Sequence, residues 1–344
     1  MKGKATYLIS TAVLAAALVS PTAGAGHGRL GLAGRTTLLA GAPRHLAETS
    51  WWGGTYSISD GERIAIYIST SYPEWGSRAQ QWVDFFAGLP HGKEISFLRV
   101  YVAPIAEVSE LCSSVEALGC YGGLTLVTVG DTTDGISPAS VAAHEYGHHV
   151  AANRSNAPWR AVDWGTKRWA SKIGVCSRVK RGTAFPGDEG LNYPLNPGEA
   201  FAESYRVLAE TNGTAEGYDW PIADPSFRPT PDSLAALRDD VLHPWAGPTT
   251  KTIRGKFLRG KHIWSAQVAT PFDGDFRVRV TAPGSGADDV KVLSGDGGTL
   301  LATGSWNGSR RKSAEYRVCG ARSVRVRVIR AVAAARFTLQ VQVP

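Results

Sequence analysis

The chain has 344 residues, of which 43% are hydrophobic and 19% are charged. This is the composition of an ordinary globular protein, which excludes a disordered chain, and the sequence carries no Gly-X-Y period or solenoid repeat. The length favours two domains, each large enough for its own core. The net charge of +7 is uneven, because residues 249–344 carry 17 basic and 6 acidic side chains. Such a basic tail favours contact with an anionic surface; the alternative is that its arginines only keep exposed strand faces soluble.

Residues 1–25 have the features of a secretory signal peptide. Lys2 and Lys4 precede a short apolar run, which is followed by small residues up to Ala25. The run is too short for a good membrane span, and no later stretch approaches about 18 apolar residues. We therefore expect a secreted protein without a membrane span, in which residues 26–50 form a linker or a pro-segment.

Four cysteines in an exported chain predict disulfides. Cys112 and Cys120 flank a predicted turn, which favours a local bridge between them. The remaining Cys176 and Cys319 would then join the two domains. Four cysteines allow three pairings, and the sequence alone does not choose among them. Zinc binding by these cysteines is the weaker interpretation, because they show no Cys-x-x-Cys spacing.

Residues 51–247 mix strand and helix patterns, which predicts an α+β domain. A long loop is expected at residues 174–196, and Asp232 is expected to cap the last helix of the domain. The expected strands are Arg63–Ser71, Ile95–Val102 and Leu124–Val129, and the expected helices are Ser77–Leu89, Pro138–Asn153, Ala161–Ile173, Pro197–Glu210 and Ser233–Leu242.

Residues 248–344 show short alternating segments separated by Gly and Asp. Evenly spaced short strands of this kind predict an all-β sandwich. Arg277 and Arg279 alternate with valines, as do Arg325 and Arg327, which places each arginine pair on one face of its strand. The expected strands are Gln267–Thr270, Phe276–Thr281, Val290–Leu293, Tyr316–Val318, Val324–Ile329 and Phe337–Val343.

One short motif carries the chemistry predicted for this chain. His144, Glu145 and His148 form the pattern H-E-x-x-H within a predicted helix. Residues four apart lie on the same helix face, so both imidazoles can reach one Zn²⁺ ion. Glu145 borders that ion, where it can take a proton from a water molecule. The alternative interpretation is a solvated helix face that carries paired histidines.

The third ligand has to come from elsewhere, because a catalytic zinc site keeps three protein ligands and one open position. The extended pattern H-E-x-x-H-x-x-G-x-x-H is excluded, since Ala151 and Arg154 occupy its later positions. Asp163 is a candidate, but the G-T-x-D signature of aspartate-type sites is absent around it. Glu199 and Glu203 lie four apart on a predicted helix, so one can bind the metal while the other holds a ligand histidine.

At these residues the chain resembles the gluzincin zinc metallopeptidases, the thermolysin-like and anthrax-lethal-factor-like group. They pair H-E-x-x-H with a Glu on a downstream helix, followed four residues later by an acidic residue. The resemblance covers about residues 60–245 and implies a zincin-like fold. It also implies that Glu199 is the third zinc ligand and that Glu203 holds a ligand histidine, with the reverse assignment as the alternative.

The same resemblance implies a donor that stabilises negative charge on the carbonyl oxygen. Tyr193 lies shortly before Glu199, and lethal-factor-like enzymes place a Tyr in this neighbourhood. His243 is the alternative, because some gluzincins use a late His; either residue can instead be a packing residue. His149 is expected near the site but not as a ligand, because its position on the helix points it elsewhere.

The tail resembles the pre-peptidase C-terminal β-domains of secreted bacterial peptidases. Gly274-Asp275-Phe276, the segment Tyr316–Gly320 and the final strand Phe337–Val343 carry this likeness. The resemblance implies attachment, folding assistance or substrate contact as the role of this domain.

These observations predict a secreted zinc metallopeptidase with Glu145 as general base and a protein or peptide as substrate. We expect a monomer with no specific nucleic-acid partner, and the edge of the strand Leu124–Val129 is expected to pair with an extended substrate. A binding or attachment protein with a structural or inactive zinc site is the alternative. A hydrolase of non-peptide amides also remains open, since the metal chemistry is the same.

Overall fold

The computed structural model of the chain describes residues 50–281, 289–306, 311–329 and 336–344. The predicted signal peptide, residues 1–25, and nearly all of the predicted linker or pro-segment, residues 26–50, lie outside these ranges. Within the described ranges, no helix combines the length and the hydrophobicity that a membrane crossing requires.

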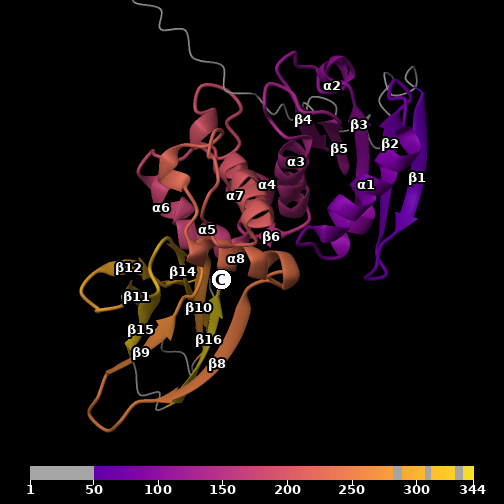
Figure 1. Cartoon of the computed structure of the whole chain (residues 1–344). Helices are drawn as coiled ribbons and strands as arrows, with labels where there is room; N and C mark the ends of the chain where they lie inside the picture. Colours follow the sequence, from indigo (N-terminus) through magenta and orange to yellow (C-terminus); the bar gives the residue numbers. More distant parts are fainter. Residues whose placement is uncertain (1–49, 282–288, 307–310, 330–335) are drawn as a thin grey trace, which may run out of the picture.

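A five-stranded mixed sheet with helices packed against it forms the first half of the chain, in the strand order β1-β2-β3-β5-β4 (Figure 1). Its three central strands are parallel, while β1 and β4 are antiparallel to their neighbours. The central strands bury branched apolar side chains, as expected for strands covered by helices. These strands are β1 (Trp51–Ser57), β2 (Arg63–Ser69), β3 (Arg99–Ala103), β4 (Gly119–Gly122) and β5 (Thr125–Val129).

Strand β5 corresponds to the predicted strand Leu124–Val129, but it does not lie at an edge of the sheet. It pairs with β3 on one side and with β4 on the other. The expectation that its own edge receives a substrate is therefore wrong. The edge strand at this end of the sheet is β4, whose sequence Gly-Cys-Tyr-Gly gives little strand signal because glycine is depleted in strands.

Two long helices cross next to this edge of the sheet. Helix α3 (Pro138–Ala152) follows β5 and packs against both β4 and β5, and helix α7 (Pro197–Thr211) packs across α3. Proline occupies the first helical position in both, where its missing N–H costs no hydrogen bond. Asn196 caps α7 by accepting a hydrogen bond from the Gly198 N–H at 2.9 Å. Figure 1 shows the two helices side by side in the middle of the molecule.

Several helix boundaries differ from the sequence prediction. The predicted helix Ala161–Ile173 is broken at Gly165, whose φ of 74° is left-handed, so two helices form in its place. The expected loop at 174–196 contains a helix and a 3-10 turn at Tyr193–Leu195. The cap of the last helix is Thr230 rather than Asp232. The elements not yet named are α1 (Trp75–Gly88), the 3-10 turns η3 (Lys93–Phe97) and η5 (Pro225–Phe227), α2 (Ile105–Leu111), β6 (Ser155–Asn156), β7 (Trp159–Arg160), α4 (Ala161–Trp164), α5 (Lys167–Ile173), α6 (Val175–Lys180) and α8 (Pro231–Leu242).

The tail is a β-sandwich, as its alternating pattern predicts. One sheet has the order β13-β14-β10-β16-β8 and the other β12-β11-β15-β9, and their apolar faces share one core. All of their strand pairs are antiparallel. The strands are β8 (Thr249–Lys256), β9 (Ile263–Ala269), β10 (Gly274–Thr281), β11 (Asp289–Ser294), β12 (Leu300–Thr303), β13 (Ser305–Trp306), β14 (Arg311–Val318), β15 (Ser323–Ile329) and β16 (Arg336–Val343).

Two disulfides are present, in the pairing that the sequence favours. Cys112 and Cys120 form a local bridge beside β4 with a Cα–Cα distance of 5.8 Å. Cys176 of α6 and Cys319 of the tail form the second, with a Cα–Cα distance of 5.2 Å. The second bridge therefore ties the β-sandwich covalently to the first half of the chain.

Candidate metal centre

Helix α3 places two histidines on one face. His144 and His148 lie four residues apart, so their side chains stand one helical turn from each other, and both are buried with at most 1% exposure. Their ring centroids are 5.0 Å apart. Burial of two imidazoles so close together requires polar partners, because an unsatisfied ring nitrogen in the interior is costly.

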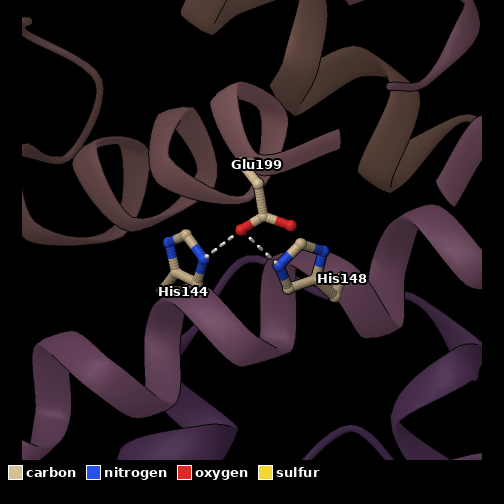
Figure 2. Close-up of side chains that lie close together, drawn as sticks. All are labelled: His144, His148 and Glu199. Carbon is tan, nitrogen blue, oxygen red and sulfur yellow. Dashed lines mark ion pairs between the residues drawn. The ribbon is translucent and has the colours of Figure 1, made fainter. Parts of the chain in front are cut away.

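Helix α7 supplies a carboxylate to this histidine pair. Glu199 Oε2 lies 3.4 Å from His144 Nε2 and 3.3 Å from His148 Nε2. Figure 2 shows the carboxylate reaching down between the two rings. One ligand atom from each of the three residues falls within 4.8 Å of the others, so this buried group can hold a metal ion.

The close crossing of the two helices depends on a small residue. A Cβ on Gly147 would lie 2.7 Å from the Cα atom of Ala202, which is closer than carbon atoms approach in proteins. Gly147 thus allows α7 to approach α3 at the level of the histidines. Ala202 lies three residues after Glu199 on α7, so this contact sets how near the carboxylate comes.

A second carboxylate from α7 orients one of the histidines. Glu203 Oε2 lies 3.1 Å from His144 Nδ1, on the side of the ring away from Glu199. Arg206 holds Glu203 in turn, with its Nε and Nη2 atoms donating to the two carboxylate oxygens at 3.0 and 2.8 Å. Burial alone would raise the pKa of Glu203, but the bonds from His144 and Arg206 lower it to about 2. Glu203 is therefore a charged acceptor that fixes the ring orientation of His144.

Glu145 lies between this cluster and the edge strand of the sheet. Its side chain is 1% exposed, and a Cβ built on Gly119 of β4 would lie 3.2 Å from the Glu145 Cγ atom. Its charge raises the pKa of both His144 and Tyr193, so it borders both residues. The absence of a side chain at Gly119 lets β4 approach the Glu145 side chain closely.

Tyr193 comes from the 3-10 turn that precedes α7. Its hydroxyl donates a hydrogen bond to Glu199 Oε2 at 2.8 Å. Burial raises the pKa of Tyr193 well above its usual value of 10, and the charges of Glu199 and Glu145 raise it further. The phenol therefore stays protonated at neutral pH and can act as a hydrogen-bond donor beside the cluster.

Three carboxylates surround the two imidazoles. Burial lowers the pKa of His144, but bonds to Glu199 and Glu203 and the charge of Glu145 outweigh this and raise it to about 10. A site with this excess of negative charge favours a cation at its centre. The nitrogen and oxygen donors are those that bind zinc and other first-row transition ions, so the residues present fit such a metal.

Other residues considered from the sequence lie outside the cluster. His149 is buried on a different side of α3, where its Nε2 lies 2.8 Å from the Glu94 carbonyl oxygen, and burial lowers its pKa to about 4. Asp163 lies 3.5 Å from Arg160. His243 ends α8 with 74% of its side chain exposed and pairs with a carboxylate of that helix. None of the three belongs to the group that can hold a metal among the described residues.

Two residues that shape the site were not identified from the sequence. Arg206 lies three residues after Glu203, a helical spacing that brings the two side chains together and could have pointed to the pair. Gly147 lies inside the H-E-x-x-H motif at a position where any residue fits the pattern. Only the close contact between α3 and α7 in the structure shows that this position requires glycine.

Comparisons with known proteins add little to this description. No protein-family model matches the chain, and no curated protein matches it. Among solved structures, the pre-peptidase C-terminal domain of a collagenase from Bacillus anthracis matches with 16% identity and a TM-score of 0.22. The match covers 27% of this chain and 86% of that one.

Proposed function

We propose that this protein is a secreted zinc metallopeptidase with a zincin-like catalytic domain. The observation that carries the proposal is the buried triangle of His144, His148 and Glu199, next to a glutamate that follows the first histidine. Two imidazoles and one carboxylate are the protein ligands of a common class of hydrolytic zinc site. The two disulfides fit an oxidising, extracellular location.

These three residues would hold a zinc ion, and a catalytic zinc site with three protein ligands would keep its fourth position for water or substrate. Bound zinc would polarise a carbonyl group and lower the pKa of a water molecule at the site. Glu199 is the proposed ligand rather than Glu203, because only Glu199 lies near the Nε2 atoms of both histidines. Glu203 instead holds His144 from behind through Nδ1.

Glu145 is the proposed general base. Its buried carboxylate borders the cluster on the side of β4, where it can accept a proton from water and later deliver it to the leaving amine. Tyr193 is the proposed donor to the carbonyl oxygen. Its protonated hydroxyl lies at Glu199 and can turn its hydrogen bond toward the developing negative charge.

The proposed substrate is an extended peptide beside strand β4. This strand ends the sheet and runs past Glu145, with glycine at both of its ends. Backbone groups at a sheet edge can pair with an added strand, which would place a peptide bond next to the general base.

One observation favours a second candidate, a binding or attachment protein with a structural metal site. The side chains of His144, His148 and Glu199 are 0–1% exposed, as in a closed structural site. A catalytic site would need a path to solvent, and the turn that carries Tyr193 beside the cluster is half-buried. The two candidates differ in whether the purified protein cleaves a peptide bond.

The test is casein cleavage by the secreted protein, with and without a chelator, together with its zinc content. The variant Glu145→Gln should retain one zinc ion and lose at least about 100-fold in activity. The control Glu116→Gln changes an exposed glutamate and should match the wild type in both. Full activity of Glu145→Gln would remove Glu145 from the mechanism, and zinc content without any cleavage would favour the structural site.

A further inference from the structure

The five-stranded sheet of the tail presents one face to the sandwich core and the other to solvent. Along β10, Phe276, Val278 and Val280 are buried, while the residues between them are exposed or half-buried. Strand β16 alternates in the same way, and the strand register carries the alternation across the sheet. We call the solvent side of β8, β10, β14 and β16 the outer face.

Charge on the outer face is strongly unbalanced. Its described side chains include six basic groups and two acidic ones. The basic residues are Arg254, Lys256, Arg277, Arg279, Arg317 and Arg336, and the acidic residues are Asp275 and Glu315.

The two acidic residues are confined to the end of the face nearest the helices. Asp275 lies 2.9 Å from Arg317, and Glu315 lies 3.2 Å from Arg277. These pairs balance the charge at this end, where β10 begins beside the Cys176–Cys319 bridge. The rest of the outer face therefore carries a net positive charge, unlike this neutral end.

The four remaining basic residues form a distal basic patch, defined as Arg254, Lys256, Arg279 and Arg336. Arg336 is directly opposite Lys256, and Arg254 is one row nearer the helices, opposite Thr338. Arg279 follows in the next row, opposite Gln340. Within the described parts of the chain, these four side chains form no ion pair. Like charges directly opposite each other destabilise a sheet, and a bound anion would relieve that repulsion.

Hollows connect the distal basic patch to the junction with the helices. One, of about 260 Å³, is lined by Arg279 and Gln340 and also by Arg277 and Gln342. A second, of about 210 Å³, shares Arg277 and Gln342 with the first and is lined further on by Trp245. Figure 1 shows β8 and β16 running from the helices to the far end of the tail, so the outer face extends along their length.

We propose that the outer face binds an acidic polysaccharide, with its charged groups on the distal basic patch. Arginine forms paired hydrogen bonds with carboxylate and sulfate groups, so Arg254, Arg279 and Arg336 suit such a chain. The amides of Gln340 and Gln342 can bond to sugar hydroxyls, since they both donate and accept.

The residues that line the face favour a polysaccharide over single-stranded nucleic acid. Nucleic-acid grooves of that kind stack bases on several aromatic rings. The described outward side chains of these strands include no aromatic ring, and Trp245 lies only at the far end of the second hollow. That ring already carries the Lys167 ammonium group 4.3 Å from its centroid, so it offers no stacking platform for a base. The inference does not depend on whether the first half of the chain is a hydrolase.

The experiment measures binding of a heparin oligosaccharide to the full secreted protein at 0.15 M salt, about the physiological ionic strength. The triple variant Arg254→Gln, Arg279→Gln, Arg336→Gln should weaken binding by at least about tenfold. A matched variant, Lys291→Gln, Arg325→Gln, Arg327→Gln, removes the same charge from the other sheet of the sandwich and should change binding less than about threefold.

Thermal melting of both variants establishes that the tail remains folded. Equal loss in the two variants would show that net charge alone attracts the oligosaccharide and would overturn the proposal. Equally tight binding of a single-stranded DNA of the same charge would also overturn it, because the face would then be a surface for any polyanion. Absence of heparin binding by the wild type has the same consequence.

Discussion

The helix crossing at Gly147 can be tested by adding one methyl group. In Gly147→Ala, the new Cβ would lie 2.7 Å from the Ala202 Cα atom, whereas carbon atoms normally approach to about 3.5–4.0 Å. Because the contact is with backbone, α7 must shift by about 1 Å. Overpacking of this kind costs about 1–3 kcal/mol, and alanine recovers about 1 kcal/mol in a helix interior. The free energy of unfolding should therefore fall by no more than about 2 kcal/mol.

The effect on metal binding should be larger, because a metal site tolerates only about 0.2 Å of error in its bond lengths. Glu199 moves with Ala202, so zinc affinity should fall about 10- to 100-fold, measured by competition with a chromophoric chelator. Gly88→Ala is the matched control, since a Cβ at Gly88 meets open space. Wild-type zinc affinity in Gly147→Ala would refute the idea that this crossing sets the ligand geometry.

Three further predictions concern the residues around the site. Arg206→Ala should weaken zinc binding about 10- to 100-fold by loosening Glu203, with partial recovery in Arg206→Lys; unchanged affinity in a chelator competition would contradict this. Tyr193→Phe should lower kcat for peptide hydrolysis about 100- to 1,000-fold while zinc content stays the same, and an unchanged kcat would remove the proposed donor. Glu94 is buried, and although burial raises its pKa, the charge of Arg154 and further hydrogen bonds lower it below 4.5. Because the pKa of Glu94 is lower in the folded protein than in the unfolded chain, its charged form stabilises the fold at neutral pH. Glu94→Gln should therefore lower the free energy of unfolding by about 3 kcal/mol at pH 7, measured by urea unfolding, and by progressively less as the pH falls below about 4. A cost that stays constant down to pH 3 would contradict the charge-based explanation.

The candidate metal ligands are predictable from the sequence where they depend on local spacing. His144 and His148 are one helical turn apart in any helix that contains them, and Glu199 and Glu203 follow the same rule on another helix. Which of the two carboxylates lies near the Nε2 atoms of both histidines depends on how α3 and α7 cross. That crossing is set by a backbone contact at Gly147, to which no periodic pattern in the sequence points.

The missed features of the fold have similar causes. The helix break at Gly165 was hidden because apolar residues continue on both sides of it, and a left-handed glycine shows no signal of its own in such a run. Strand β4 was missed because two of its four residues are glycines. Without β4, the sequence pattern leaves the neighbouring strand β5 as the edge of the sheet.

The most direct test of the proposed zinc site is a crystal structure of the purified protein with data collected at the zinc absorption edge. We predict one anomalous peak about 2.0–2.2 Å from His144 Nε2, His148 Nε2 and a Glu199 oxygen, with the fourth position not taken by protein. No peak at these three residues would contradict the metal site, and a fourth protein ligand on the ion would contradict the hydrolase.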